Sequence, residues 1–112
     1  DVPTVQINSS YDDILLEMIN KKKGTCIVMD EKKLIGIITD GDLRRNINDN
    51  ISKIDIITNT KPISIDSNNF VSSAIELMSR YDINSLVVKD SGEYVGVLFL
   101  DFMKKHDFIF AK

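Results

Sequence analysis

The chain has 112 residues, of which 43% are hydrophobic and 28% charged, a composition typical of one globular domain or of two small halves that share a core. Fourteen basic and 17 acidic residues give a net charge of −3, so the chain has no excess of positive charge to neutralise nucleic-acid phosphates. Only 7% of the residues are aromatic, which also disfavours stacking on bases. A single Cys excludes an internal disulfide and favours a reducing, cytoplasmic setting.

The sequence shows no membrane span and starts without Met. No apolar run approaches the roughly 18 residues that a transmembrane helix needs. The first residues also lack the charged-then-apolar pattern of a signal peptide. We therefore expect a piece of a longer cytoplasmic protein.

The sequence matches itself when it is shifted by 60 positions. Similar apolar residues coincide along the expected strands and helices, and several matches are identities. These matches keep their order within the same expected elements, so the chain is predicted to hold two copies of one unit. Identical pairs include Met18 with Met78, Val28 with Val88, Asp30 with Asp90 and Gly36 with Gly96.

The first copy is predicted to run strand, helix, strand, strand, helix. An extended piece covers residues 4–7, short β-branched runs at 26–29 and 34–39 favour a hairpin, and a last short helix starts near Asp42. The intervening helix is expected to bury Ile14, Leu15, Met18 and Ile19, with Ser10 as its N-cap and Gly24 as its end.

The second copy is predicted to repeat this order, with strands at 63–65, 86–88 and 94–100 and a last helix near Asp101. Its first helix is expected to bury Val71, Ala74, Ile75 and Met78, with Asn69 as N-cap.

The expected domain organisation is repeat 1 at 1–48, a linker with one helical turn at 49–61, and repeat 2 at 62–112. Neither half has enough core to be stable alone. The predicted fold is therefore α+β, with two β-α-β-β-α repeats packed sheet to sheet about a pseudo-twofold axis.

Residues 36–42, Gly-Ile-Ile-Thr-Asp-Gly-Asp, close the first copy. This stretch and the repeat resemble a tandem pair of CBS domains, a Bateman module, over nearly the whole chain. With residues 15–18, 23–25 and 43–45, the chain is most similar to the CBS pair of D-arabinose 5-phosphate isomerases of the KpsF/GutQ type. It also resembles the CBS pairs of sugar-nucleotide transferases.

The resemblance implies a non-catalytic regulatory module. Its parent would be a cytoplasmic isomerase of carbohydrate metabolism, near Kdo, lipopolysaccharide or capsule synthesis, with the active site in a preceding domain. It further implies a homodimer through the CBS pairs within a larger homo-oligomer. Two alternatives remain, a ligand-free dimerisation module and the sensor of a sugar nucleotidyltransferase.

Thr39 and Asp42 are the principal candidate binding residues. Thr39 ends a predicted strand and Asp42 opens a helix, whose unpaired N–H groups and partial positive charge suit a phosphate. The resemblance assigns the phosphate to the Thr39 hydroxyl and the ribose hydroxyls to the Asp42 carboxylate. The alternative is structural, with Asp42 as an N-cap and Thr39 as a strand-end residue.

Further candidates surround this pair. Gly41 can adopt an unusual backbone angle or admit a ligand closely, and Arg44 or Arg45 can bind an anion or form a solvated helix face. Backbone groups of Thr4, Val5, Cys26 and Ile27 are expected to line the pocket for the base. The resemblance implies AMP, ADP, ATP or CMP-Kdo as the regulatory ligand, with no catalytic cofactor.

The second copy departs from this pattern. Phe99 replaces the Thr, and Asp101 follows its Gly by five positions rather than six, which we interpret as a one-residue deletion and a degenerate site. Gly36 and Gly96 are expected to serve packing. Phe102, Phe108, Ile109 and Phe110 form an apolar tail suited to an interface.

The sequence offers no set of catalytic residues. Cys26 is expected to be a buried apolar residue without a catalytic His partner, and Asp12, Asp13 and Glu17 suit the start of a helix. The lone His106 is not expected to bind a metal.

Overall fold

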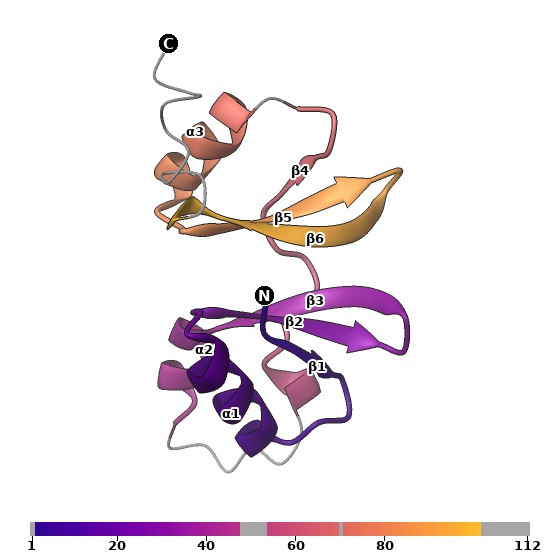
Figure 1. Cartoon of the computed structure of the whole chain (residues 1–112), viewed down its shortest axis with the longest axis vertical. Coiled ribbons are helices and arrows are strands. Elements are labelled where there is room, and N and C mark those ends of the chain that lie inside the picture. The colour runs from indigo at the N-terminus through magenta and orange to yellow at the C-terminus, as the bar shows by residue number, and fades with distance from the viewer. Residues whose placement is uncertain (1, 48–53, 70, 102–112) are drawn as a thin grey trace. The chain divides into compact units, whose positions relative to one another are not determined.

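The computed structural model describes residues 2–47, 54–69 and 71–101 and divides the chain into two compact units, Asp1–Pro62 and Ile63–Lys112 (Figure 1). In the first unit, a three-stranded sheet has the order β1-β2-β3, with β1 parallel to β2 and β3 antiparallel to it. Its elements are β1 (Thr4–Gln6), α1 (Tyr11–Lys21), β2 (Thr25–Asp30), β3 (Lys33–Thr39), α2 (Asp40–Arg45) and the 3-10 turn η1 (Ile54–Ile56).

The second unit repeats this topology in the order β4-β5-β6. The pairing register is identical after a shift of 60, because Val28 pairs with Gly36 and Val88 with Gly96, each pair followed by an irregularity of the bulge type. Its elements are β4 (Ser64–Asp66), α3 (Val71–Tyr81), β5 (Ser85–Asp90) and β6 (Glu93–Phe99). The predicted α+β repeat is thus confirmed, while the packing of one sheet on the other stays a prediction.

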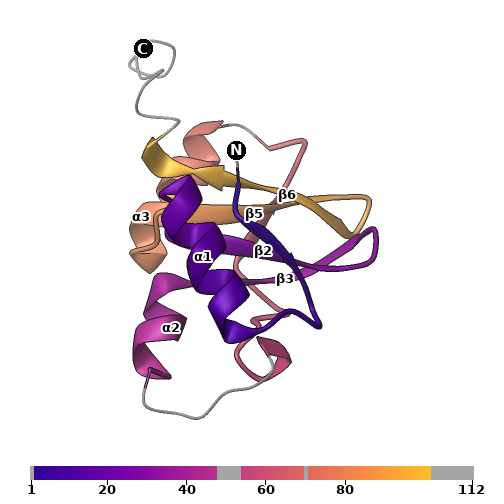
Figure 2. The ribbon, with the colours of Figure 1, turned by 60° about the horizontal axis from the view of Figure 1, so that its bottom comes forward.

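Each sheet buries one face against its own helices. In the first unit, α1 and α2 cover the same face (Figures 1 and 2), and Met18 of α1 meets Cys26 and Ile38 of the sheet in one cluster. Ile19 was expected in this core but is 69% exposed. The helical period points it away from the buried side of α1. The core of the second unit consists of Ile65, Ala74, Met78 and Leu86.

The ends of α1 show one confirmed prediction and one wrong one. Ser10 is the N-cap, and its backbone N–H in turn donates to Asp13 at 3.0 Å, completing a capping box. The helix does not run on to Gly24. Lys22 takes the left-handed conformation, with φ at 54°, and donates its N–H to the Met18 carbonyl.

The linker belongs structurally to the first unit. The predicted helical turn is present as η1, and Ile54 and Ile57 are buried in the first core. Beyond it, Ile37 and Asn59 exchange two backbone hydrogen bonds of 3.0 and 2.9 Å. The edge of β3 is therefore covered by the chain leaving the turn. The finer segment boundaries stay predictions.

Gly36 is required by that covering segment. A Cβ placed there would lie 2.9 Å from the Thr58 Cγ2 and closer still to the Asn59 carbonyl oxygen. We expect Gly36→Ala to lower the free energy of unfolding by about 1–3 kcal/mol, because the backbone of residue 59 must move and its hydrogen bonds weaken. Denaturant unfolding measures the change.

Gly96 provides the matched control, since no described atom lies within 4 Å of a Cβ placed there. Gly96→Ala should be neutral or slightly stabilising, because it only reduces chain entropy in the unfolded state. Equal losses for both variants would contradict this account.

Candidate ligand-binding site

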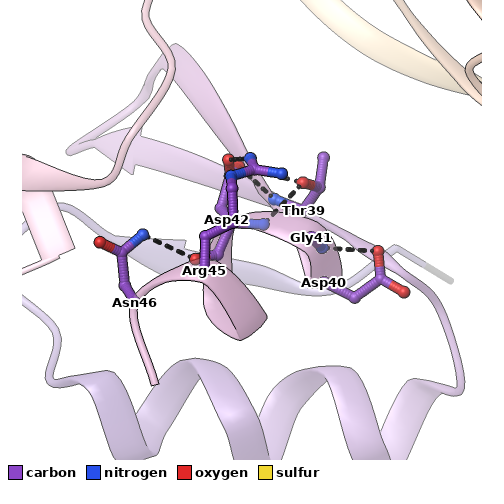
Figure 3. A network of polar contacts seen from close by, with 6 residues as sticks. All are labelled: Thr39, Asp40, Gly41, Asp42, Arg45 and Asn46. Carbon is purple, nitrogen blue, oxygen red and sulfur yellow. Dashed lines mark hydrogen bonds and ion pairs between the residues drawn. The ribbon is translucent and has the colours of Figure 1, made fainter. Parts of the chain in front are cut away.

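Thr39 and Asp42 lie together at the corner where β3 passes into α2 (Figure 3). The Asp42 N–H donates to Thr39 Oγ1 at 3.2 Å, while the Thr39 N–H donates to Asp42 Oδ2 at 2.9 Å. The Thr39 hydroxyl also donates to that carboxylate oxygen, at 3.0 Å. The N-cap is therefore Thr39, and Asp42 is the third helical residue, so the expectation that Asp42 itself is the N-cap is wrong.

The backbone N–H groups of this corner are already paired. The Asp40 N–H donates to the Gly24 carbonyl at 2.8 Å, and the Gly41 N–H donates to Asp40 Oδ1 at 2.9 Å. With the Asp42 N–H bonded to Thr39, the first turn offers no unpaired donor of the kind expected from the sequence. A ligand at this corner would depend on side chains rather than on the helix terminus.

The two arginines of α2 pair with different carboxylates. Arg44 binds Asp40 at 3.2 Å, whereas Arg45 binds the Oδ1 atom of Asp42. Arg45 therefore lies at the corner (Figure 3), and Arg44 pairs at the other carboxylate. Both arginine side chains are about 70% exposed, so these ion pairs contribute little stability and exchange readily. Both arginines were candidates for binding an anion. Residues three apart on a helix are neighbours, and this spacing indicates that Arg45 pairs with Asp42.

Gly41 leaves room for this arrangement. A Cβ there would lie 3.2 Å from Arg45 Nη1 and 3.6 Å from Thr39 Oγ1. The expectation of an unusual backbone angle is wrong, because among the described glycines only Gly92 has a positive φ. The absence of a side chain at Gly41 thus leaves room for the Arg45 guanidinium, while close approach of a ligand stays a prediction.

The expected base-pocket residues lie on β1 and β2, of which β2 is the neighbour of β3 in the sheet. Thr4 of β1 pairs with Ile27 of β2, and Cys26 pairs with Ile38 next to the corner. The side chains of Val5 and Cys26 are buried in the core, which leaves backbone contacts as their means of touching a ligand.

Two backbone N–H groups of these strands are already hydrogen-bonded within the fold. The Thr4 N–H donates to Glu17 Oε2 at 2.9 Å, and the Ile27 N–H donates to the Pro3 carbonyl at 2.8 Å. Sequence reasoning missed the Glu17 contact, because the two residues belong to different elements. The hydrogen bond from the Tyr11 hydroxyl to the Leu43 carbonyl, 3.1 Å long, was missed for the same reason; it ties α1 to α2.

The second copy keeps the corner's backbone and changes its side chains. The Leu100 N–H donates to the Asn84 carbonyl at 2.8 Å, as the Asp40 N–H does to Gly24. The register therefore continues without the expected deletion, and Asp101 corresponds to Gly41 rather than to Asp42. Phe99 stands in place of Thr39, and the sequence places Phe102, outside the described residues, in place of Asp42.

Two surface grooves lie elsewhere. One runs between α1 and α2, and the other in the second unit is lined by Ser67, Asn69 and Leu98 among others. Thr39 and Asp42 line neither of them. Over residues 2–47, 54–69 and 71–101 there is no cluster of three or more potential metal ligands. His106 and the apolar tail lie outside those ranges. None of the described helices has the length and apolar character needed to cross a membrane.

Comparison with known families identifies the repeat. The CBS domain model matches residues 1–49 and again residues 52–101. The chain belongs to the CBS domain family and contains two of its domains, so the resemblance inferred from residues 36–42 is confirmed.

Relatives of known name are isomerases that extend beyond this match. Arabinose 5-phosphate isomerase KdsD of Yersinia pestis is 35% identical over 88% of this chain and 31% of its own length. The KdsD protein of Francisella tularensis is 32% identical over 97% of this chain and 33% of its own. The chain thus spans about a third of the curated relatives it matches.

Solved structures show the same fold. The structure of CBSX2 in complex with AMP has a TM-score of 0.81 at 21% identity and covers 99% of this chain and 90% of that one. The CBS domain pair of protein MJ0100 in complex with 5′-methylthioadenosine and S-adenosyl-L-methionine has a TM-score of 0.78 at 24% identity, covering 94% and 90%. These likenesses confirm the fold class.

Glu17 should make stability depend on pH. Hydrogen bonds from the Thr4 N–H and from Lys21 lower the pKa of Glu17 from its ordinary value of 4.5. A depressed folded-state pKa stabilises the fold above the unfolded value and loses that effect as the pH falls through the folded value. Glu17→Gln should therefore lower the free energy of unfolding at pH 7, and its effect should shrink progressively as the pH falls below 4.5. A pH-independent difference would contradict this assignment.

Cys26 should be chemically inert in the folded chain. Burial raises the pKa of its thiol to about 12, with a further contribution from the charge of Glu17. Thiolate is the reactive form, so a thiol reagent at pH 8 should label Cys26 only slowly until denaturant is added. Rapid labelling of the native chain would show that β2 opens frequently.

Proposed function

We propose that this chain is a non-catalytic regulatory module that binds a nucleotide or sugar nucleotide and modulates an attached sugar-phosphate isomerase. Membership of the CBS family supports the regulatory role. The arabinose 5-phosphate isomerases it resembles are about three times as long, which supports an active site outside the matched region. In this proposal the parent is a cytoplasmic homo-oligomer of the Kdo or lipopolysaccharide pathway.

The observation that carries the proposal is the pairing of Thr39 with Asp42 at the first repeat's corner. The Thr39 hydroxyl would turn from Asp42 to a phosphate oxygen, and Asp42 would exchange Arg45 for the ribose hydroxyls. The Arg45 side chain is 69% exposed, so its guanidinium can leave Asp42 for water, whereas the Asp42 carboxylate is only 21% exposed and needs the new partner. The released guanidinium is then available to the phosphate.

The base would lie against the backbone of β1 and β2 at Thr4, Val5, Cys26 and Ile27. Gly41 permits close approach at the other end of the ligand. AMP, ADP and ATP are the first ligands to test, because the similar CBSX2 structure contains AMP and the MJ0100 structure contains two adenosine derivatives. CMP-Kdo is a second candidate, as a downstream product acting by feedback.

One observation favours the alternative of a ligand-free dimerisation module. The Thr39–Asp42 corner is fully hydrogen-bonded by its own residues, so the fold needs no ligand to complete it. In the second alternative, the chain is still a sensor, but the enzyme attached to it is a sugar nucleotidyltransferase rather than an isomerase.

A thermal-shift and calorimetric titration with AMP, ADP, ATP, CMP and CMP-Kdo tests the proposal. We expect saturable stabilisation by at least one of them, since a ligand that binds only the folded state raises its melting temperature. Asp42→Ala should abolish that response, and Thr39→Val should weaken it for phosphorylated ligands more than for the nucleoside.

The capping box of α1 supplies a matched control. Asp13 bonds to Ser10 as Asp42 bonds to Thr39, so Asp13→Ala and Asp42→Ala each lose one cap, worth about 1 kcal/mol. Only Asp42→Ala should lose ligand binding. Absence of any ligand response in the wild-type chain would favour the dimerisation module.

A further inference from the structure

The second unit contains an open groove where α3 packs on the β4-β5-β6 sheet (Figure 1). Its volume is about 240 Å³. The apolar part of its lining consists of Ile65, Ala74, Val88 and Leu98. Apolar side chains that line an open groove lack the stabilisation that full burial would give them. A segment that covered this groove would therefore stabilise the second unit.

The same place is filled in the first unit. After the shift of 60, the four apolar residues of the groove correspond to members of the first core. These members are Val5 for Ile65, Ile14 for Ala74, Val28 for Val88 and Ile38 for Leu98. The first core also contains Ile54 and Ile57, which come from the segment that follows α2. That segment therefore covers, in the first copy, the residues whose counterparts line an open groove in the second.

Burial differs between the two copies in the way that this cover predicts. Val28 and Ile38 of the first sheet are both 0% exposed. Their counterparts Val88 and Leu98 are only partly buried, although the strands pair in the same register. Over the described residues, the second core has no counterpart of the segment that follows α2 in the first unit.

The apolar tail has the composition and the position in the chain to supply this cover. Phe108 follows Asp101 by seven positions, and seven extended residues can reach about 23 Å. In the first copy the chain likewise leaves α2 and then buries Ile54 in the core of the same unit. Residues two positions apart project to the same side of an extended segment, so Phe108 and Phe110 share one side and Ile109 takes the other.

We propose that Phe108 and Phe110 of the apolar tail bind in the groove of the second unit of their own chain, against Val88 and Leu98. The tail takes the place that the segment after α2 fills in the first unit, and it completes the second core. Ile109 points away from the groove. None of these residues belongs to the corner between β3 and α2, so this contact is independent of the proposed ligand site.

Thermal unfolding of the 112-residue chain tests the contact. The double variant Phe108→Ala with Phe110→Ala should melt about 5–10 °C below the wild type, because apolar area that is buried in the groove returns to water. The control variant Ile109→Ala should melt within about 2 °C of the wild type, since its side chain faces solvent. Equal melting of the double variant and the wild type would contradict the proposal.

The first copy suggests a variant that fills the groove from within. Ala74 corresponds to Ile14, so Ala74→Ile introduces into the groove a side chain that this topology accepts. The larger residue occupies space that the two phenyl rings need. In this background, Phe108→Ala with Phe110→Ala should lower the melting temperature by less than half as much, because residues that share one cavity are not additive. Fully additive effects would show that the rings lie elsewhere.

Nuclear Overhauser contacts locate the tail directly in the wild-type chain. We expect contacts from the ring protons of Phe108 and Phe110 to the methyl groups of Val88 and Leu98. A mixture of isotope-labelled and unlabelled chains distinguishes contacts within one copy from contacts between two copies. Rings without contacts to these methyl groups, or contacts found only between copies, would overturn the proposal.

Discussion

The reciprocal hydrogen bonding of Thr39 and Asp42 determines the geometry of the corner between β3 and α2. One side-chain pair ends β3, starts α2 and satisfies the Asp42 N–H of the first turn. It also positions the Asp42 carboxylate so that its other oxygen meets Arg45. The polar side chains of Thr39, Asp42 and Arg45 are thus all bonded to one another within the fold. In the proposed function, binding at this corner would be an exchange of partners, and its affinity would be the difference between the new contacts and those given up.

Sequence periodicity was sufficient for most of the fold, because strands, amphipathic helices and N-caps depend on neighbours in the chain. The repeat of 60 residues and the Ser10 cap were predicted for this reason. Contacts between distant segments were not. The backbone hydrogen bonds between Ile37 and Asn59 explain the need for Gly36, but the sequence around these two residues contains no pattern that predicts the bonds.

The errors at the site have physical causes as well. Counting from Gly96 to Asp101 suggested a deletion, whereas the conserved strand pairing and the bond from Leu100 to Asn84 hold the register and leave Asp101 one position earlier. The helix end was assigned to Gly24 because glycine tolerates the left-handed conformation most easily, but Lys22 adopts it and Asp82 does so in the second copy.

The two copies divide structural and functional features unequally. Their hairpins keep one register, while the residues that make the first copy distinctive, Thr39, Asp42, Leu16 and Ile19, correspond to Phe or polar residues in the second. In the first copy α2 joins these features physically. Asp42 of this helix belongs to the ligand corner, and Leu43 lines the groove beside α1, where its carbonyl accepts the Tyr11 hydroxyl. In the proposed function, a ligand that draws Arg45 away from Asp42 would act on the same six-residue helix that packs against α1. A shift of α2 against α1 is then the simplest way for the corner to affect the rest of the first repeat, because α2 contacts both.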